Sequence, residues 1–235
     1  MSHEVSAKDS PTAHKSSEYD DKIIYTIPNY TRIHLECLHL ADTVCPKPSA
    51  WLDTGCGTGT FAAAAMGRFP DTTFYLADPS ESMLDICRAK LAVHKASGKC
   101  IITSCASMEV DLPENSLDVI TAIQCHHYMD PAGREKSTAH LFRLLKPGGL
   151  YIHFENIRPA SMIGMEIGKE RWRRFLMEHG RSFEEAYVQV ERLDSEFFPI
   201  TIEEHLSLLR ETGFAGSEIL WASYMQAGFY SVKGA

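Results

Sequence analysis

The residues with the clearest capacity for chemistry are three glycines at alternate positions, Gly55, Gly57 and Gly59, within residues 51–60. An apolar stretch precedes them and an alanine-rich stretch follows, which predicts a strand, a tight turn and a helix. Because glycine lacks a Cβ atom, such a turn can adopt positive φ and approach a ligand closely. The first N–H groups of the following helix are free to donate to that ligand. The sequence therefore predicts a site for a nucleotide-like cofactor.

The spacing of these glycines distinguishes between cofactors. A dinucleotide fingerprint reads G-x-G-x-x-G, with the third glycine opening the helix. Here Thr60 stands where that third glycine would be. The pattern is typical of enzymes that use S-adenosylmethionine (SAM) and disfavours a nicotinamide-dependent dehydrogenase.

Asp78 lies 23 residues after Gly55, at the end of a strand predicted over residues 73–77. A carboxylate in that place can accept hydrogen bonds from both hydroxyl groups of a ribose. The alternative is that Asp78 caps the helix that begins after Pro79, since aspartate is favoured there in any protein.

The segment Gln124-Cys-His-His-Tyr128 follows a strand predicted over residues 117–123. His126 or His127 could accept a proton from an oxygen, nitrogen or sulfur nucleophile, because imidazole is partly neutral at cellular pH. Alternatively, both rings only form a wall of the cleft. Paired histidines could also bind a metal, but no carboxylate or cysteine stands at a ligand-like interval, so we expect no metal site.

Strand and helix patterns alternate through the middle of the chain, which indicates right-handed crossovers and an open parallel sheet. Within residues 20–44, the apolar pattern predicts two short helical stretches, which are broken at Pro28-Asn29. The segment 156–200 has helical periodicity and predicts a helical cap. A capping box at Thr201 and Glu204 starts a further helix. Strands are predicted over residues 50–53, 73–77, 100–104, 117–123, 150–154, 217–223 and 228–232, and helices over 60–68, 80–94 and 130–146.

Length and composition predict one domain. We expect residues 1–17 to form a disordered tail and residues 18–235 a single domain, with N-terminal helices or a lid at 18–45 and the cap inserted at 156–200. The formal net charge of -8 disfavours nucleic acid as a partner. No segment reaches the ~20 apolar residues that span a bilayer, so we expect no membrane association. Seven scattered cysteines without zinc-type spacing are typical of a reduced, cytoplasmic protein.

With the glycine turn, Asp78 and the closing helix and hairpin, the chain resembles the class I SAM-dependent methyltransferases. The resemblance implies an α/β fold with a seven-stranded, mostly parallel, Rossmann-like sheet whose last strand is antiparallel. It also implies SAM as the cofactor, with Asp78 at the ribose, Met83 on the adenine face and the Ala106 backbone near the adenine. The cofactor-binding candidates are Asp53, Gly55, Gly57, Gly59, Asp78, Met83, Ala106, Gln124, Tyr19 and Tyr30.

A narrower likeness involves residues 27–30, Ile-Pro-Asn-Tyr, and residues 220–230, which resemble the carboxy-SAM synthase branch. Members of that branch hold the new carboxylate with an arginine in the C-terminal third, and whether Arg192 occupies that position is left open. Tyr19 and Tyr30 either close over the cofactor as a lid or belong to an ordinary packed helix.

The cap contributes the candidates for substrate binding: Arg158, Trp172 and Arg192. Arginine offers a planar fork to a carboxylate or phosphate, although the basic cluster at 169–174 could equally be a solvated helix face. We expect in-line methyl transfer from SAM to a small molecule. A carboxy-SAM synthase-like enzyme and a non-catalytic SAM-binding module are the alternatives. The oligomeric state is open, with a homodimer among the options.

Overall fold

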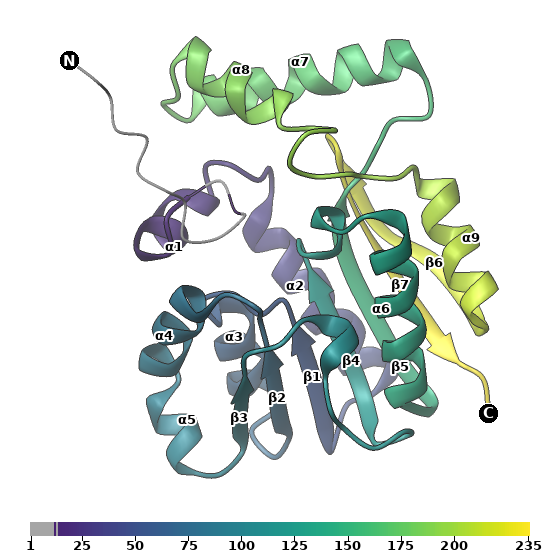
Figure 1. The fold of residues 1–235 in the computed structure, drawn as a ribbon. Coiled ribbons are helices and arrows are strands. Elements are labelled where there is room, and N and C mark those ends of the chain that lie inside the picture. Colours follow the sequence, from purple (N-terminus) through teal and green to yellow (C-terminus); the bar gives the residue numbers. More distant parts are fainter. Residues whose placement is uncertain (1–11, 13) are drawn as a thin grey trace.

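The computed structural model describes residue 12 and residues 14–235, and a seven-stranded sheet forms its centre (Figure 1). The strand order is β3-β2-β1-β4-β5-β7-β6, with parallel pairing from β3 to β5 and with β7 antiparallel to both of its neighbours. The predicted α/β fold with a mostly parallel, seven-stranded sheet is confirmed. The strands are β1 (Ala50–Thr54), β2 (Thr73–Ala77), β3 (Cys100–Thr103), β4 (Leu117–Ile123), β5 (Leu145–Asn156), β6 (Phe214–Ser223) and β7 (Gln226–Lys233).

Helices cover both faces of this sheet, and two of them form a cap beyond the ends of the strands (Figure 1). Helices α2 and α3 pack on one face, whereas α6 and α9 pack on the other. The cap consists of α7 and α8, which contact each other. The helices are α1 (Tyr19–Ile23), α2 (Tyr30–Val44), α3 (Thr60–Arg68), α4 (Glu81–Lys90), α5 (Ala92–Ala96), α6 (Pro131–Leu144), α7 (Met162–Glu178), α8 (Phe183–Glu191) and α9 (Ile202–Thr212).

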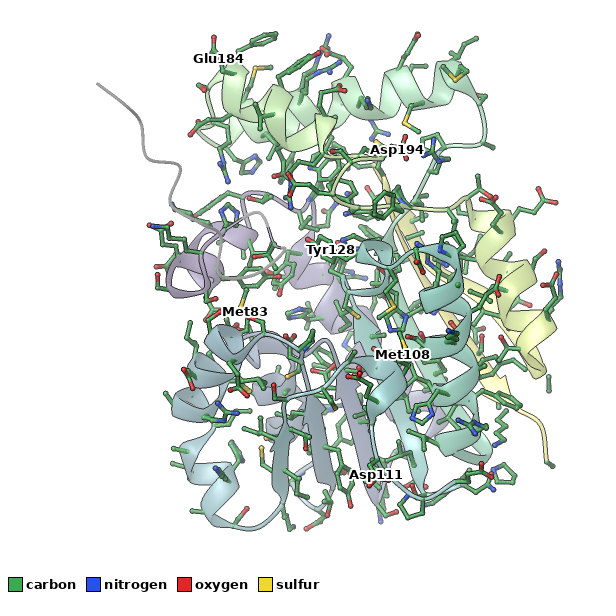
Figure 2. All side chains as sticks on the ribbon, viewed as in Figure 1. Met83, Met108, Asp111, Tyr128, Glu184 and Asp194 are labelled. Atoms are coloured by element: carbon green, nitrogen blue, oxygen red, sulfur yellow. The ribbon has the colours of Figure 1, made fainter. Side chains whose placement is uncertain are left out.

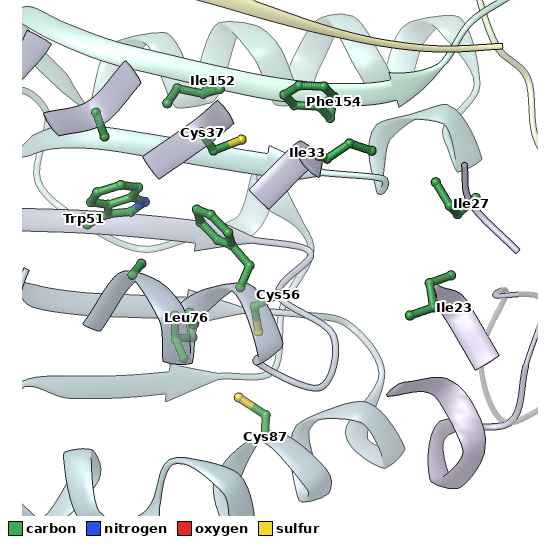
Figure 3. Packing of buried hydrophobic residues seen from close by; sticks show 14 of the residues in the cluster. Ile23, Ile27, Ile33, Cys37, Trp51, Cys56, Leu76, Cys87, Ile152 and Phe154 are labelled. Atoms are coloured by element: carbon green, nitrogen blue, oxygen red, sulfur yellow. The ribbon is translucent and has the colours of Figure 1, made fainter. Parts of the chain in front are cut away.

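Alternation along each strand creates two separate cores, because successive side chains of a strand point to opposite faces. Trp51 and Ile152 are fully buried in the core that includes α2, α3 and α4 (Figure 3). Their neighbours Leu52 and Tyr151 are buried in the core against α6 and α9. Strands covered on both faces explain the continuous apolar runs in the sequence.

Two of the differences between the structure and the predicted elements have a clear local cause. The helix predicted over residues 80–94 is divided at Leu91, whose φ of -102° and ψ of 17° leave the helical region while its side chain stays buried. The fifth strand begins at Leu145 rather than at residue 150, because Leu145 already pairs with Leu117 before a register shift.

The N-terminal segment is packed where the structure describes it. His14 lies with its Nε2 atom 2.7 Å from Oγ1 of Thr26, and the hydroxyl groups of Ser16 and Ser82 are 2.7 Å apart. Residues 14–17 therefore differ from the predicted tail, while residues 1–11 and 13 lie outside the described part. Within residue 12 and residues 14–235, none of the helices has both the length and the apolar character needed to cross a bilayer.

Candidate functional site

The glycine turn joins β1 to α3 in the conformation that the sequence predicts. Gly55, Gly57 and Gly59 have φ values of 66°, 53° and 76°. The amides of Gly55 and Cys56 donate to the Ala77 carbonyl at 2.7 and 3.1 Å, which fixes the turn to the end of β2. A Cβ atom on Gly55 would lie 2.4 Å from the Cβ atom of Cys125, whereas the space beside Gly57 is open. The turn is thus closed against β4 on one side and open on the other.

Asp78 fastens the same turn from the end of β2. One carboxylate oxygen accepts the Gly57 amide at 2.8 Å, and the other accepts the Ser80 amide at 2.9 Å. The side chain that caps α4 is Ser80, which accepts from the Met83 amide. Burial raises the pKa of Asp78, while the two backbone hydrogen bonds act to lower it. Each carboxylate oxygen can accept one further hydrogen bond from a ligand.

Three cavities share Tyr19 as a wall. The main cavity measures about 210 Å³ and is lined by Asp78, Met83 and Ala106 among others. The turn cavity, about 30 Å³, lies between Asp53, the glycine turn and Tyr30. The cap cavity, about 20 Å³, is lined by His127, Tyr128, Gln189, Arg192 and neighbouring residues.

Gln124, at the end of β4, lines both the main cavity and the cap cavity. Its φ is 56°, a conformation that costs roughly 1–3 kcal/mol for a residue other than glycine. Both polar atoms of its side chain are buried and have no hydrogen-bond partner among the described residues. A buried amide without partners is unfavourable, so a ligand that supplies partners there is stabilised. This unsatisfied amide fits a ligand group bound where the main and cap cavities meet.

Asp53 is a buried carboxyl group at the turn cavity. Thr121 donates to it at 2.7 Å. Burial, opposed by the Thr121 hydrogen bond and assisted by the nearby Asp78, raises the pKa of Asp53 to about 7. A cationic ligand in the turn cavity would favour the ionised carboxylate.

The structure separates the two histidines. His126 lies between the Ser107 and Tyr151 hydroxyl groups, at 2.9 and 3.4 Å, and lines none of the three cavities. His127 lines the cap cavity, and its Nδ1 atom lies 2.6 Å from a carboxylate oxygen of Glu155. The Nε2 atom of His127 is 3.2 Å from Nδ2 of Asn156. Of the pair, His127 alone faces the cavities.

Glu155, at the end of β5, is a residue that sequence reasoning missed. It is fully buried and accepts the backbone amides of His126 and His127 at 3.1 and 3.0 Å. Burial acts to raise the pKa of Glu155, but the hydrogen bond and the charge of His127 outweigh it and lower the pKa to about 2. Its place at the carboxyl end of a central strand was the available signal, because sites in open α/β sheets gather there.

The cap residues predicted for substrate binding lie in three different environments. Arg192 is 5% exposed, donates to Glu196 and Gln189 at 2.9 and 3.2 Å, and lines the cap cavity. Trp172 is buried and donates to the Thr26 carbonyl at 2.9 Å, which ties α7 to the N-terminal segment. Arg158 forms an ion pair with Asp194 and lines a separate cavity beside α9.

The remaining predicted cofactor residues surround the cavities. Met83, on α4, and Tyr128, between the cap and the sheet, are labelled in Figure 2, and both line the main cavity. The Ala106 amide donates to Glu109 at 3.0 Å, so this amide already has a partner. Tyr19 and Tyr30 are hydrogen-bonded to each other. Gly59 caps α3 and does not line a cavity.

Comparison with known proteins shows which proteins this chain is similar to. A model described as a methyltransferase domain matches residues 52–149, the part that holds the turn, Asp78 and Gln124. Residues 52–149 thus carry a methyltransferase domain. Over 219 residues it is 25% identical to the carboxy-S-adenosyl-L-methionine synthase of Helicobacter hepaticus, covering 90% of each chain. The corresponding enzyme of Wolinella succinogenes is 28% identical, with 92% of this chain and 90% of the relative covered.

Solved structures share the fold of this methyltransferase domain. Phosphoethanolamine N-methyltransferase 2 of Haemonchus contortus, in complex with S-adenosylhomocysteine, matches with a TM-score of 0.67, 15% identity, 95% of this chain and 59% of its own. Human N-acetylserotonin methyltransferase, in complex with SAM, matches with a TM-score of 0.60, 15% identity, 86% of this chain and 52% of its own. The chain therefore spans little more than half the length of these two proteins.

Proposed function

We propose that this protein transfers the methyl group of SAM in line to a small anionic molecule bound in the cap cavity. The observation that carries the proposal is the unsatisfied amide of Gln124, which lies where the main and cap cavities meet. In this arrangement the adenosine occupies the main cavity, with Asp78 at the ribose and Met83 beside the adenine. The methionine part lies at the turn cavity, next to Asp53.

The protein's own contribution is mainly positioning. When bound, SAM supplies an activated methyl group on a sulfonium. Holding two reactants in line lowers the activation barrier by about 7–11 kcal/mol. A general base has a smaller effect and raises the rate by about 10²–10⁴-fold. Gln124 and Tyr128 hold the groups on either side of the methyl group, and Tyr19 excludes water. His127, oriented through Nδ1 by Glu155, is the residue placed to accept a proton at Nε2, once the acceptor displaces the amide of Asn156 from that atom.

Arg192 determines the charge of the proposed acceptor. Its guanidinium group is buried at the cap cavity, and Tyr128 is hydrogen-bonded to it. The planar guanidinium group of a buried arginine can donate two parallel N–H bonds to a carboxylate or phosphate, so it favours an anionic acceptor. Arg158 does not share this role, because it lines a different cavity, beside α9.

The N-terminal segment acts as a lid in this proposal. A cavity of about 20 Å³ holds roughly one water molecule, so an acceptor requires the lid to open and the cavity to widen around it. Tyr19 and Tyr30 would close over the cofactor again after entry. The lid at 18–45 and the cap at 156–200 thus remain parts of one proposed functional unit.

Carboxy-SAM synthesis is the second candidate. It is favoured by the buried Arg192, which could hold the carboxylate of a carboxylated cofactor, and by the curated relatives of that name. Mass spectrometry of the nucleoside that co-purifies with the protein separates the two. SAM or S-adenosylhomocysteine supports methyl transfer, whereas the heavier carboxylated cofactor supports the second candidate. If the reduced protein carries no adenosyl ligand and binds none, both candidate functions are contradicted.

The cysteines and the net charge support a proposed location and substrate class. All seven cysteines are free thiols in the structure, which supports a cytoplasmic location. The net charge of -8 supports a small-molecule substrate over a nucleic acid.

A further inference from the structure

Two thiols meet beneath the glycine turn. Cys56 stands between Gly55 and Gly57, and Cys87 lies on α4. Their side chains are hydrogen-bonded, and Figure 3 shows the two sulfur atoms facing each other. Both belong to the same buried core cluster. Neither thiol has a part in the transfer reaction proposed above.

The two thiols differ in access to solvent. Cys87 is fully buried and is pressed against the turn, since a Cβ atom on Gly59 would lie 2.7 Å from its sulfur. Cys56 is 9% exposed and lines the turn cavity of about 30 Å³. That space admits a molecule about the size of water. A small oxidant can therefore reach Cys56, and Cys87 is already in place behind it.

We propose that Cys56 and Cys87 form a reversible disulfide that closes the cofactor site, with hydrogen peroxide as the oxidant. The Cys56 sulfur attacks one peroxide oxygen, the O–O bond breaks, and a sulfenic acid and one water form. The Cys87 sulfur then attacks the sulfenic sulfur, forms the S–S bond and displaces the oxygen as a second water. The two thiol protons leave in these waters, both cysteines are oxidised, and the peroxide is reduced.

The disulfide acts on the cofactor through the backbone of the turn. An S–S bond of about 2.05 Å is shorter than any hydrogen bond between thiols, so Cys56 and α4 must approach each other. Cys56 is bound through its amide to Ala77 at 3.1 Å, and its neighbour Gly57 is bound to Asp78 at 2.8 Å. Pulling Cys56 toward α4 displaces these groups together. The effect on SAM rests on the proposed function, but formation of the bond does not.

Peptide mapping and titration test the two parts separately. The full chain is treated with hydrogen peroxide, digested without reductant and analysed by mass spectrometry, and S-adenosylhomocysteine is titrated before and after treatment. We expect a Cys56–Cys87 cross-linked peptide and a loss of affinity of about tenfold or more, equal to about 1.4 kcal/mol. Dithiothreitol should restore the affinity.

Two variants serve as controls. Cys87→Ser removes the bond and should keep its affinity after peroxide, whereas Cys105→Ser, at a half-buried thiol, should behave like the wild type. A wild-type map in which Cys105 is oxidised without the Cys56–Cys87 link overturns the proposal, whether or not Cys87→Ser folds. An intact link with unchanged affinity overturns the effect on the cofactor. If reduced protein does not bind S-adenosylhomocysteine at all, the proposed function fails while the link is still detected by mass.

Discussion

At the scale of single residues, Asp78 is the carboxylate with the most specific role. It holds the Gly57 amide and lines the main cavity. We predict that Asp78→Asn weakens SAM binding by about 10- to 150-fold, because hydrogen bonds to charged groups contribute about 1.5–3 kcal/mol. Isothermal titration measures the affinity, and a thermal melt checks the fold. The matched control is Asp71→Asn, at a fully exposed side chain, which should leave binding unchanged. Equal affinities in both variants would refute the ribose assignment.

We predict that Asp53 makes SAM binding depend on pH. Its pKa of about 7 means that the carboxyl group is largely protonated at pH 6 and largely ionised at pH 8. The sulfonium of SAM favours the ionised form, so affinity should rise with pH, by up to about tenfold per pH unit below the pKa. Titrations at pH 6, 7 and 8 measure this, and Asp53→Asn should remove the dependence. S-adenosylhomocysteine, which lacks the sulfonium charge, should show a smaller rise. Identical profiles for wild type and Asp53→Asn contradict the prediction.

The candidate site shows which residues a sequence can reveal. The glycine turn and Gln124 were predictable, since local spacing and the position after a strand carry their signal. Glu155 was not, because its role arises from contacts with His126 and His127, which are distant in sequence. The sequence also left Arg158 and Arg192 equivalent, and only tertiary packing places one of them at the cap cavity.

At the scale of elements, Asp20 on α1 fastens the lid to the glycine turn. Its carboxylate accepts the hydroxyl groups of Thr58 and Thr60 at 2.6 and 2.8 Å and pairs with Lys90 at 2.6 Å. These hydrogen bonds, together with Lys90, lower the pKa of Asp20 although burial acts to raise it, so the carboxylate stays ionised at neutral pH. These contacts thus join the proposed lid directly to the glycine turn.

We predict that Asp20→Asn speeds the dissociation of S-adenosylhomocysteine by about tenfold, since charge-assisted hydrogen bonds are roughly twice as strong as neutral ones. Stopped-flow displacement measures the rate. Asp21→Asn, the adjacent position on the same helix, is the control and should keep the wild-type rate. The lid role is excluded if the two variants dissociate equally slowly.

The elements themselves were largely predictable, for physical reasons. The bounds of α3, β2 and β4 agree with the prediction, because turns or caps end each apolar run. The division of the predicted helix into α4 and α5 at Leu91 was not predictable, because it depends on how the Leu91 side chain packs beside Gly59. The individual helices of the cap were also not resolved from the sequence, where residues 156–200 showed periodicity without clear ends.

At the scale of the whole molecule, the pKa values of buried histidines predict a loss of stability at acidic pH. Burial lowers the pKa of His34 and of His205 to about 4 and lowers that of His153 as well. In the unfolded chain these histidines bind protons from pH 6.5 downward, whereas in the folded chain they stay neutral until about pH 4. The stability of the folded state associated with the neutral histidines is therefore complete above pH 6.5 and is lost as the pH falls toward 4. Asp53 opposes them, because its raised pKa favours the folded state at low pH. By linkage, the pKa shifts of His34 and His205 together change the free energy of unfolding by roughly 7 kcal/mol across this pH range. The opposing shift of Asp53 corresponds to roughly 4 kcal/mol.

We therefore predict that the melting temperature falls between pH 6.5 and pH 4.5. Differential scanning calorimetry measures the change. His205→Phe, which keeps an aromatic ring beside Phe229, should reduce the slope because it removes one titrating group. A melting temperature that is constant or rises over this range shows that the histidines do not control stability.

We propose that SAM binds in the cavity between the glycine turn and the N-terminal lid. Isothermal titration of the reduced protein with SAM measures this binding directly. We expect saturable binding of one SAM per chain, competed by S-adenosylhomocysteine and not by NAD. Absence of binding at millimolar SAM would contradict it.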